Sequence, residues 1–220
     1  MTMSMDAANY PQQLESAAKR LQAKGLMQAD DTLSCRMPGA AFFLWSTPPD
    51  DAGQRGLMEL PLTASGNAAQ DLHRLVYKAR PDVGAVLLSR QHWASMLPAA
   101  GKPMPGIFDE QLRHLGWLVR KISTPFTLEA ASRELADGAN AYNLDIEVMC
   151  LGMSLERVVF NAELLEKCAK AWLLASASGL PVGKIPWLVR WIATGRLKKD
   201  QKRAAEHYQR GVAPPRSAGY

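Results

Sequence analysis

The sequence contains few of the side chains from which disulfide frameworks and metal sites are built. Its 220 residues include three cysteines and four histidines. The cysteines are Cys35, Cys150 and Cys168, and no two of them have the C-x-x-C spacing. An odd set of widely separated cysteines favours reduced thiols over a disulfide framework. We therefore expect a cytoplasmic protein.

Long apolar runs are missing as well. No stretch reaches the roughly 18 consecutive apolar residues that a helix needs to cross a bilayer. The first ten residues, M-T-M-S-M-D-A-A-N-Y, contain no basic segment followed by an apolar core, so they do not resemble a signal peptide. We expect no membrane partner, and we expect residues 1–10 to be disordered.

The composition that remains is that of one ordinary globular domain. Hydrophobic residues make up 47% of the chain and charged residues 21%. A chain of this length can bury one full core. No repeat, low-complexity tract or internal boundary interrupts it, so we predict one domain over residues 11–195, followed by a basic tail over 196–220.

Positive charge is concentrated in the C-terminal part of the chain. The net charge is +5, and from Lys184 onward nine Lys and Arg residues face two acidic residues, which gives 9 − 2 = +7 there and 5 − 7 = −2 elsewhere. Such a segment could contact an acidic partner or nucleic acid. A solvated terminal helix explains it more simply, so we regard nucleic acid as an unlikely partner. We expect the tail from Gly195 to be polar and partly disordered, and the fold to survive its removal.

Two tryptophans stand just before this tail. Trp187 and Trp191 are four residues apart, which places them on one face of a helix. A tryptophan pair with this spacing is more often part of a core or a subunit interface than a ligand platform. We expect one of the first two roles.

The most informative stretch is L-H-R-L-V-Y-K-A-R-P-D-V-G-A-V-L-L-S-R-Q-H-W-A-S-M-L, residues 72–97. It predicts an amphipathic helix over residues 71–79 that stops at an Arg-Pro pair, a short apolar strand over 83–88 and a polar turn over 89–92. His73 and Tyr77 lie on the half-apolar helix, where we expect packed, hydrogen-bonded core residues.

A second long pattern, G-M-S-L-E-R-V-V-F-N-A-E-L-L-E-K-C-A-K-A, begins at Gly152. Ser154 can cap the helix that it predicts, and Gly179 can stop it. With the first stretch, this pattern resembles the class II aldolase/adducin family, in which a helix reading "LH..IY...PD" leads to a strand that ends in H-x-H. The resemblance extends over roughly residues 14–179.

The resemblance implies a fold and an assembly. The expected fold is α/β, a three-layer α/β/α domain around a largely antiparallel central sheet. Bacterial members form four-fold tetramers, so the resemblance also implies a homo-oligomer. Family enzymes bind a divalent metal, usually zinc, which polarises a carbonyl for aldol cleavage, epimerisation or decarboxylation.

The residues that would carry this chemistry are replaced. The three metal-binding histidines of the family correspond to Leu88, Arg90 and Ile146, and the general acid/base glutamate corresponds to Ala69. Arg90 has no lone pair to offer a metal and would repel a divalent cation. A methyl group cannot transfer a proton. We therefore expect no metal and no other cofactor.

The family's phosphate-binding positions keep some polar residues. In the family, a turn before the first strand holds the substrate phosphate; here that turn corresponds to residues 31–36, with Thr32 in place of an asparagine and Ser34 retained. Asn67 lies in the loop that carries phosphate-binding serines in the family. These three residues and Arg90 are the candidates for binding a small anion.

Two hypotheses follow for function. In the first, which we favour, the chain is a catalytically silent family member that acts as a binding or assembly module with itself or a protein partner. In the second, it is a metal-independent lyase, aldolase or epimerase that acts on a small carboxylate or sugar phosphate. Arg90 would then bind the anion, and His92 would transfer a proton.

Overall fold

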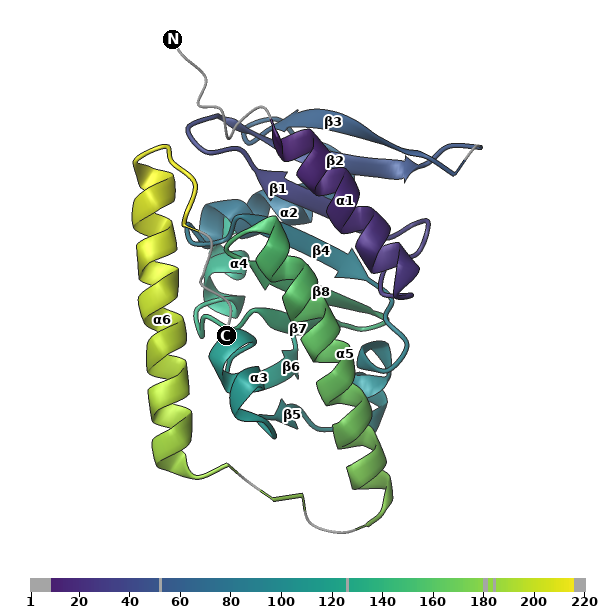
Figure 1. Ribbon diagram of the computed structural model, residues 1–220, viewed down its shortest axis with the longest axis vertical. Coiled ribbons are helices and arrows are strands. Elements are labelled where there is room, and N and C mark those ends of the chain that lie inside the picture. Colours follow the sequence, from purple (N-terminus) through teal and green to yellow (C-terminus); the bar gives the residue numbers. More distant parts are fainter. Residues whose placement is uncertain (1–8, 52, 126, 180–181, 184, 216–220) are drawn as a thin grey trace.

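The computed structural model describes residues 9–51, 53–125, 127–179, 182–183 and 185–215. Within them the chain forms one eight-stranded sheet with helices on both faces (Figure 1). The helices are α1 (Tyr10–Ala23), α2 (Ala68–Ala79), α3 (Asp109–His114), α4 (Leu128–Glu134), α5 (Leu155–Ala177), α6 (Trp187–Gln209) and the 3-10 helix η2 (Ala94–Ala100). The strands are β1 (Thr32–Arg36), β2 (Phe42–Pro49), β3 (Arg55–Pro61), β4 (Ala85–Ser89), β5 (Met104–Pro105), β6 (Leu118–Lys121), β7 (Ala141–Leu144) and β8 (Glu147–Gly152).

The strand order is β3-β2-β1-β4-β8-β7-β6-β5. Every neighbouring pair is antiparallel except β6 with β7, which run parallel. The predicted α/β fold with a largely antiparallel sheet is therefore confirmed. None of the helices within the described residues is both long enough and apolar enough to cross a membrane.

The central strand β4 separates two cores. Its residues alternate, so Ala85 and Leu87 pack in the cluster that contains α1 and α5, whereas Val86 and Leu88 pack in the cluster under α2. A strand buried on both faces reads as a continuous apolar run, because neither side of its pleat meets water. This explains why residues 83–88 were recognisable as a strand from the sequence.

The longest predicted helix is α5, and its predicted start is confirmed. The Ser154 hydroxyl accepts a hydrogen bond from the Arg157 amide at 3.2 Å, which satisfies one of the free donors of the first turn. Gly152 ends β8 immediately before the cap. A side chain there would lie 2.4 Å from the Val158 nitrogen, so only glycine allows the strand to turn this closely onto the helix.

The segment 31–36, which the resemblance implied to be a turn, is largely a strand. Residues 32–36 form β1, between β2 and β4. In β1 the hydroxyls of Thr32 and Ser34 are buried because α2 supplies hydrogen-bond partners for them.

The predicted boundary at residue 195 does not match the structure. Helix α6 runs through it without a break to Gln209, so the expectation of a partly disordered tail is wrong for residues 196–209. One side of α6 is buried at Ala193, Leu197, Gln201, Ala204 and Tyr208. Residues 1–8 and 216–220, also expected to be disordered, lie outside the described residues, and α1 already begins at Tyr10.

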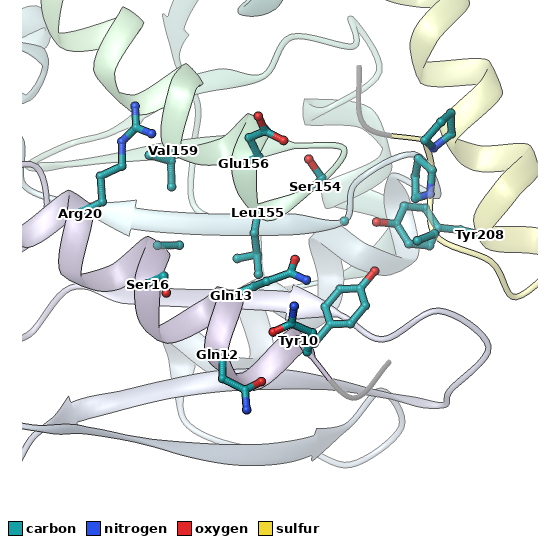
Figure 2. Close-up of a pocket in the computed structure, with 16 residues that line it drawn as sticks. Tyr10, Gln12, Gln13, Ser16, Arg20, Ser154, Leu155, Glu156, Val159 and Tyr208 are labelled. Carbon is teal, nitrogen blue, oxygen red and sulfur yellow. The ribbon is translucent and has the colours of Figure 1, made fainter. Parts of the chain in front are cut away.

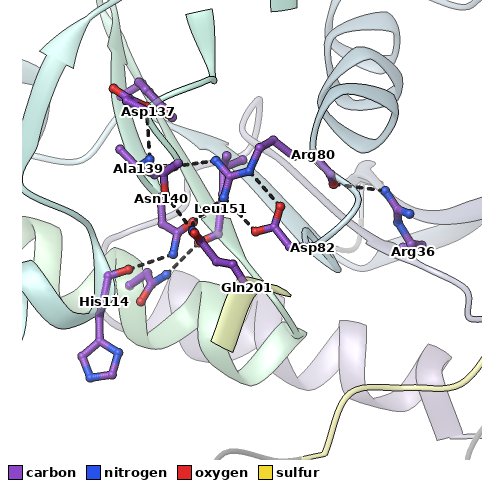
Figure 3. Close-up of polar contacts among 12 residues, drawn as sticks. Arg36, Arg80, Asp82, His114, Asp137, Ala139, Asn140, Leu151 and Gln201 are labelled. Carbon is purple, nitrogen blue, oxygen red and sulfur yellow. Dashed lines mark hydrogen bonds and ion pairs between the residues drawn. The ribbon is translucent and has the colours of Figure 1, made fainter. Parts of the chain in front are cut away.

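A buried polar network attaches α6 to the sheet (Figure 3). Arg80 and Asp82 form a two-pronged ion pair, with both N–O distances at 2.8 Å. Arg80 also donates to the Asn140 side chain at 3.1 Å, and the Gln201 amide donates to Asn140 at 3.3 Å and to the Gly138 carbonyl at 2.7 Å. Helix α6 is thus part of the domain and not an appendage.

Candidate functional site

The candidate site lies at the C-terminal end of β4. In the sheet β4 runs between β1 and β8, with Leu88 paired with Thr32 and Ser89 paired with Val148. Because both neighbours are antiparallel to β4, the residues that precede β1 and β8 gather where β4 ends. We call Asp30, Asp31, Arg90 and Glu147 the Arg90 corner.

Arg90 is held in this corner by two carboxylates. Its Nε donates to Asp31 Oδ1 at 3.4 Å and its Nη2 to Asp30 Oδ2 at 3.2 Å, and its backbone amide lies 3.3 Å from both Asp31 oxygens. Hydrogen bonds to Asp30 and Asp31 hold the pKa of the guanidinium above its usual value. The Arg90 side chain is 35% exposed, so it is reachable from solvent although it is paired.

The carboxylates of the corner differ in burial. The Asp31 side chain has no exposed surface and also accepts a hydrogen bond from the Gln28 amide at 2.6 Å. Asp30 is 82% exposed, so water competes for its bond to Arg90. Burial and the neighbouring Asp31 raise the pKa of Glu147, and Arg90 acts in the opposite direction. The corner therefore carries its own cation among three acids.

A second polar group lies under α2, entirely inside the protein. His73 Nδ1 is 2.6 Å from the Ser34 hydroxyl, His73 Nε2 is 3.1 Å from the Thr32 hydroxyl, and Ser34 also bonds the Tyr77 hydroxyl at 2.7 Å. Burial lowers the pKa of His73 to about 3, so the ring is neutral at pH 7 and has one donor and one acceptor nitrogen. The prediction that His73 and Tyr77 are packed, hydrogen-bonded core residues is confirmed.

We compared the chain with family models, curated proteins and solved structures. No family model matches the chain, and no curated protein matches it. Among solved structures, the chain is similar to YgbL, a putative aldolase/epimerase/decarboxylase from Escherichia coli, at 17% identity and a TM-score of 0.70 over 86% of this chain and 99% of that one. It is similar to an L-fuculose 1-phosphate aldolase from Glaciozyma antarctica at 17% identity and a TM-score of 0.71, over 96% and 92% of the two chains. It is also similar to an aldolase II superfamily protein from Pseudomonas syringae at 16% identity and a TM-score of 0.67, over 96% of both chains.

The chain has the class II aldolase fold. At these identities the likeness establishes the fold alone, and the site must be judged from this chain's own residues. The fold recognised from the sequence is thereby confirmed.

The resemblance predicts that Leu88, Arg90 and Ile146 correspond to the family's metal ligands. Leu88 is 4% exposed and packs under α2, and Ile146 is 68% exposed in the hairpin between β7 and β8. Neither has a lone pair, and the guanidinium of Arg90 is a positive charge. Across the described residues no group of three or more His, Cys, Asp or Glu is placed to hold a metal ion.

The remaining predicted site residues are not brought together with Arg90. Asn67 caps α2, where its side chain accepts from the Gln70 amide at 2.9 Å and the Gln70 side chain accepts from the Asn67 amide at 3.1 Å. His92 is exposed in the turn after β4, with its ring edge-on to Trp93 at 5.1 Å between centroids. Thr32 and Ser34 are buried and bonded to His73, so neither presents its hydroxyl on an open surface.

Sequence reasoning missed Asp30, Asp31 and Glu147. Their approach to Arg90 depends on the sheet order β1-β4-β8, which no local pattern reveals. A weak signal existed, because two adjacent aspartates directly before a buried strand are unusual unless a cation lies nearby.

A separate cleft of about 770 Å³ lies elsewhere on the fold, between α1, the first turn of α5 and the end of α6 (Figure 2). Tyr10, Gln13, Ser154, Glu156 and Tyr208 are among the residues that line it. Gly84, which precedes β4, is also on its wall. Six residues of nearly extended chain separate Gly84 from Arg90, or roughly 20 Å, so the cleft and the Arg90 corner are distinct.

Proposed function

We propose that this chain is a class II aldolase-fold protein that does not carry out metal-dependent aldol chemistry and acts as a binding or assembly module. The observation that carries the proposal is the Arg90 corner, where a fixed guanidinium occupies a position at which the family resemblance expects a metal ligand. A metal ion and the Arg90 guanidinium exclude each other at this position because both are positively charged. A divalent cation would face Arg90 at close range, with hydrocarbon at Leu88 and Ile146.

The position of the family's general acid/base is replaced as well. The resemblance places this group at Ala69, a methyl side chain in the first turn of α2. The nearby His73 cannot replace it, because its ring is fully buried and both nitrogens already have partners. The positions that correspond to the family's metal ligands and to its acid/base glutamate thus carry side chains that cannot do the same chemistry.

Elemental analysis of dialysed protein tests the metal part of this proposal. We expect far less than one equivalent of zinc, manganese or iron per chain, also after incubation with excess metal. One equivalent that resists dialysis, together with its loss in Asp31→Asn, would overturn the proposal and identify the acids of the corner as ligands.

The alternative enzyme, with Arg90 as anion-binding group and His92 as proton donor, has one observation in its favour. Arg90 is partly exposed, and its partner Asp30 is largely in solvent, so a stronger anion could displace Asp30. The buried carboxylate of Asp31 argues against this alternative, because it remains paired with Arg90 and neutralises its charge. Thermal-shift titration with inorganic phosphate separates the two: stabilisation that Arg90→Ala abolishes, and that the exposed control Arg133→Ala keeps, would favour the enzyme.

Assembly into a homo-oligomer is the second part of the proposal. Strand β3 forms one edge of the sheet, and Leu57 and Met58 on it are 42% and 46% exposed. An open edge strand with exposed apolar residues is suited to pairing with another chain. Sedimentation velocity should show an oligomer that Leu57→Lys combined with Met58→Lys reduces to monomer. A monomer in the wild type would remove this part of the proposal and leave the metal part unaffected.

A further inference from the structure

The first two turns of α6 expose large apolar side chains. Trp187 is 70% exposed and Trp191 is 69% exposed, so within the described chain neither belongs to a core. Leu188 and Ile192 are 51% and 42% exposed beside them. Isolated exposed leucines need no explanation, but a contiguous group with two tryptophans on a single helix marks an interaction surface. We call these four residues the apolar tip.

The apolar tip is held in place and is not a frayed end. Arg190, on the opposite side of the same turns, lies over the Trp117 ring at 4.5 Å from its centroid. One turn further along, Ala193 and Leu197 are 8% and 3% exposed, so α6 is packed against the protein body. Helix α6 lies along one side of the molecule (Figure 1), and the exposed fractions place the tip in solvent while the opposite side of the helix is packed.

Cations continue along the outward side of the same helix. Arg196, Lys198, Lys199, Lys202 and Arg203 are all exposed. Eleven residues make almost exactly three helical turns, so Lys198 lies above Trp187 and Lys202 lies above Trp191 on one face. Asp200 does not neutralise this row, because it turns inward and bonds Arg113 at 2.5 Å. We call these five cations the cationic row.

We propose that α6 docks the protein on an anionic lipid surface, with the apolar tip in the headgroup and acyl-chain boundary and the cationic row on the lipid phosphates. Tryptophan and aliphatic side chains together gain free energy at this boundary, where the indole N–H stays in the polar layer. The cationic row adds attraction that depends on anionic lipid and on salt. The proposal is independent of the Arg90 corner, and it revises the expectation that no membrane is involved.

The same surface suits other partners less well. Single-stranded nucleic acid would use stacking on the two tryptophans, but Leu188 and Ile192 offer a base no such contact. A second copy of the chain would bring two cationic rows toward each other if the helices paired in parallel. A flat anionic surface uses the tip and the row at the same time, which is the arrangement the helix presents.

Co-sedimentation of the full chain with phosphatidylcholine vesicles, with and without phosphatidylglycerol, tests the proposal. We expect binding only to the anionic vesicles, and we expect added salt to weaken it. Trp187→Ser with Trp191→Ser should reduce partitioning at least tenfold. Replacing Lys198, Lys199 and Lys202 with Gln should reduce it by roughly fivefold for each cation removed.

Matched controls change other faces of the protein. Lys19→Gln, Lys78→Gln and Lys121→Gln remove the same charge from exposed positions, and Met96→Ser with Leu128→Ser removes apolar side chains from exposed positions away from α6. Both controls should bind vesicles as the wild type does. Circular dichroism confirms that each variant is folded before its binding is compared.

Three results would overturn the proposal. The first is a wild type that does not bind anionic vesicles, or that binds neutral vesicles equally well. The second is vesicle binding that the tip and row variants retain. The third is sedimentation of the lipid-free wild type as a dimer that the tip variant alone dissociates, because the tip would then be covered by a second copy.

Discussion

Helices α5 and α6 have the same length of 23 residues, yet the protein holds them in different ways. Ten residues of α5 are buried, from Leu155 to Trp172, and nine of them are apolar or cysteine. Five residues of α6 are buried, and Gln201 is one of them. The first helix is attached by a continuous hydrocarbon surface, whereas the second is attached by fewer apolar contacts and by the polar network of Figure 3.

The two helices therefore have different roles: α5 stabilises the core, whereas α6 presents an exposed surface. Helix α5 covers the sheet and has little left to offer a partner, apart from a few side chains such as Leu174, which is 54% exposed. Helix α6 contributes less to the core, so its outward side is free to carry the apolar tip and the cationic row. If this difference is real, α6 is needed for the stability of the domain but is held less strongly than α5.

Truncation after Gly195 should have the largest effect. The structure predicts that it destabilises the domain, contrary to the expectation from the sequence, because it removes Leu197, Ala204 and Tyr208 and exposes the surfaces that they cover. Lost apolar burial and hydrogen bonds amount to about 5 kcal/mol, which is comparable to the whole stability of many domains. Thermal unfolding would measure it. An unchanged melting temperature would show that α6 is dispensable after all.

Single large-to-small substitutions compare how strongly the core contacts of α5 and of α6 stabilise the domain. Trp172→Ala in α5 removes a side chain that is 1% exposed and should cost about 4 kcal/mol, and Leu197→Ala in α6, at 3% exposure, should cost about 2 to 3 kcal/mol. Urea unfolding gives both values. The reverse order would mean that the hydrocarbon contacts of α6 hold the domain more strongly than those of α5.

Acid should weaken the region where the two helices meet α3. His114 of α3 is edge-on to Phe160 of α5, and burial together with the charges of Arg157 and Arg113 lowers its pKa to about 4. The folded-state pKa is therefore below the ordinary value of 6.5. The contribution to stability is complete above pH 6.5 and is lost as the pH falls toward 4.

At pH 5 this loss amounts to about 2 kcal/mol for His114, and buried His73 adds a loss of the same sign. In urea unfolding at pH 7 and pH 5, His114→Asn should therefore lose less stability than the wild type between the two conditions. Equal losses in the two proteins would show that His114 is not held in its neutral form in the folded state.

The sequence was sufficient to predict those helices whose formation depends on residues close together in the chain. Apolar spacing predicted α2, and apolar spacing with the cap residue Ser154 predicted α5. Strand β1 could not be predicted in this way. Its polar residues Thr32 and Ser34 are stable in the core only because His73, about 40 residues later, supplies their partners.

The candidate site was harder to predict, for a related reason. The motif led to the prediction that Arg90 corresponds to a metal ligand of the family, but its pairing with Asp31 depends on how β1 and β4 lie together. In α6 the buried side is narrow and includes Ala193, Leu197 and Ala204. The surrounding lysines and arginines suggested solvent, because charge density is seen more easily than a narrow buried side.

The smallest effect that still distinguishes the helices is at Gln201. Gln201→Ala removes the donor to the Gly138 carbonyl and to the Asn140 side chain, and leaves buried acceptors without this partner. It should cost about 1 kcal/mol. Lys202→Ala, at the next position, which is exposed, should change stability by less than about 0.5 kcal/mol. If amide exchange in Gln201→Ala becomes faster in α6 and is unchanged in α5, the polar network holds α6 alone. If exchange becomes faster by the same factor in both helices, they unfold as one unit.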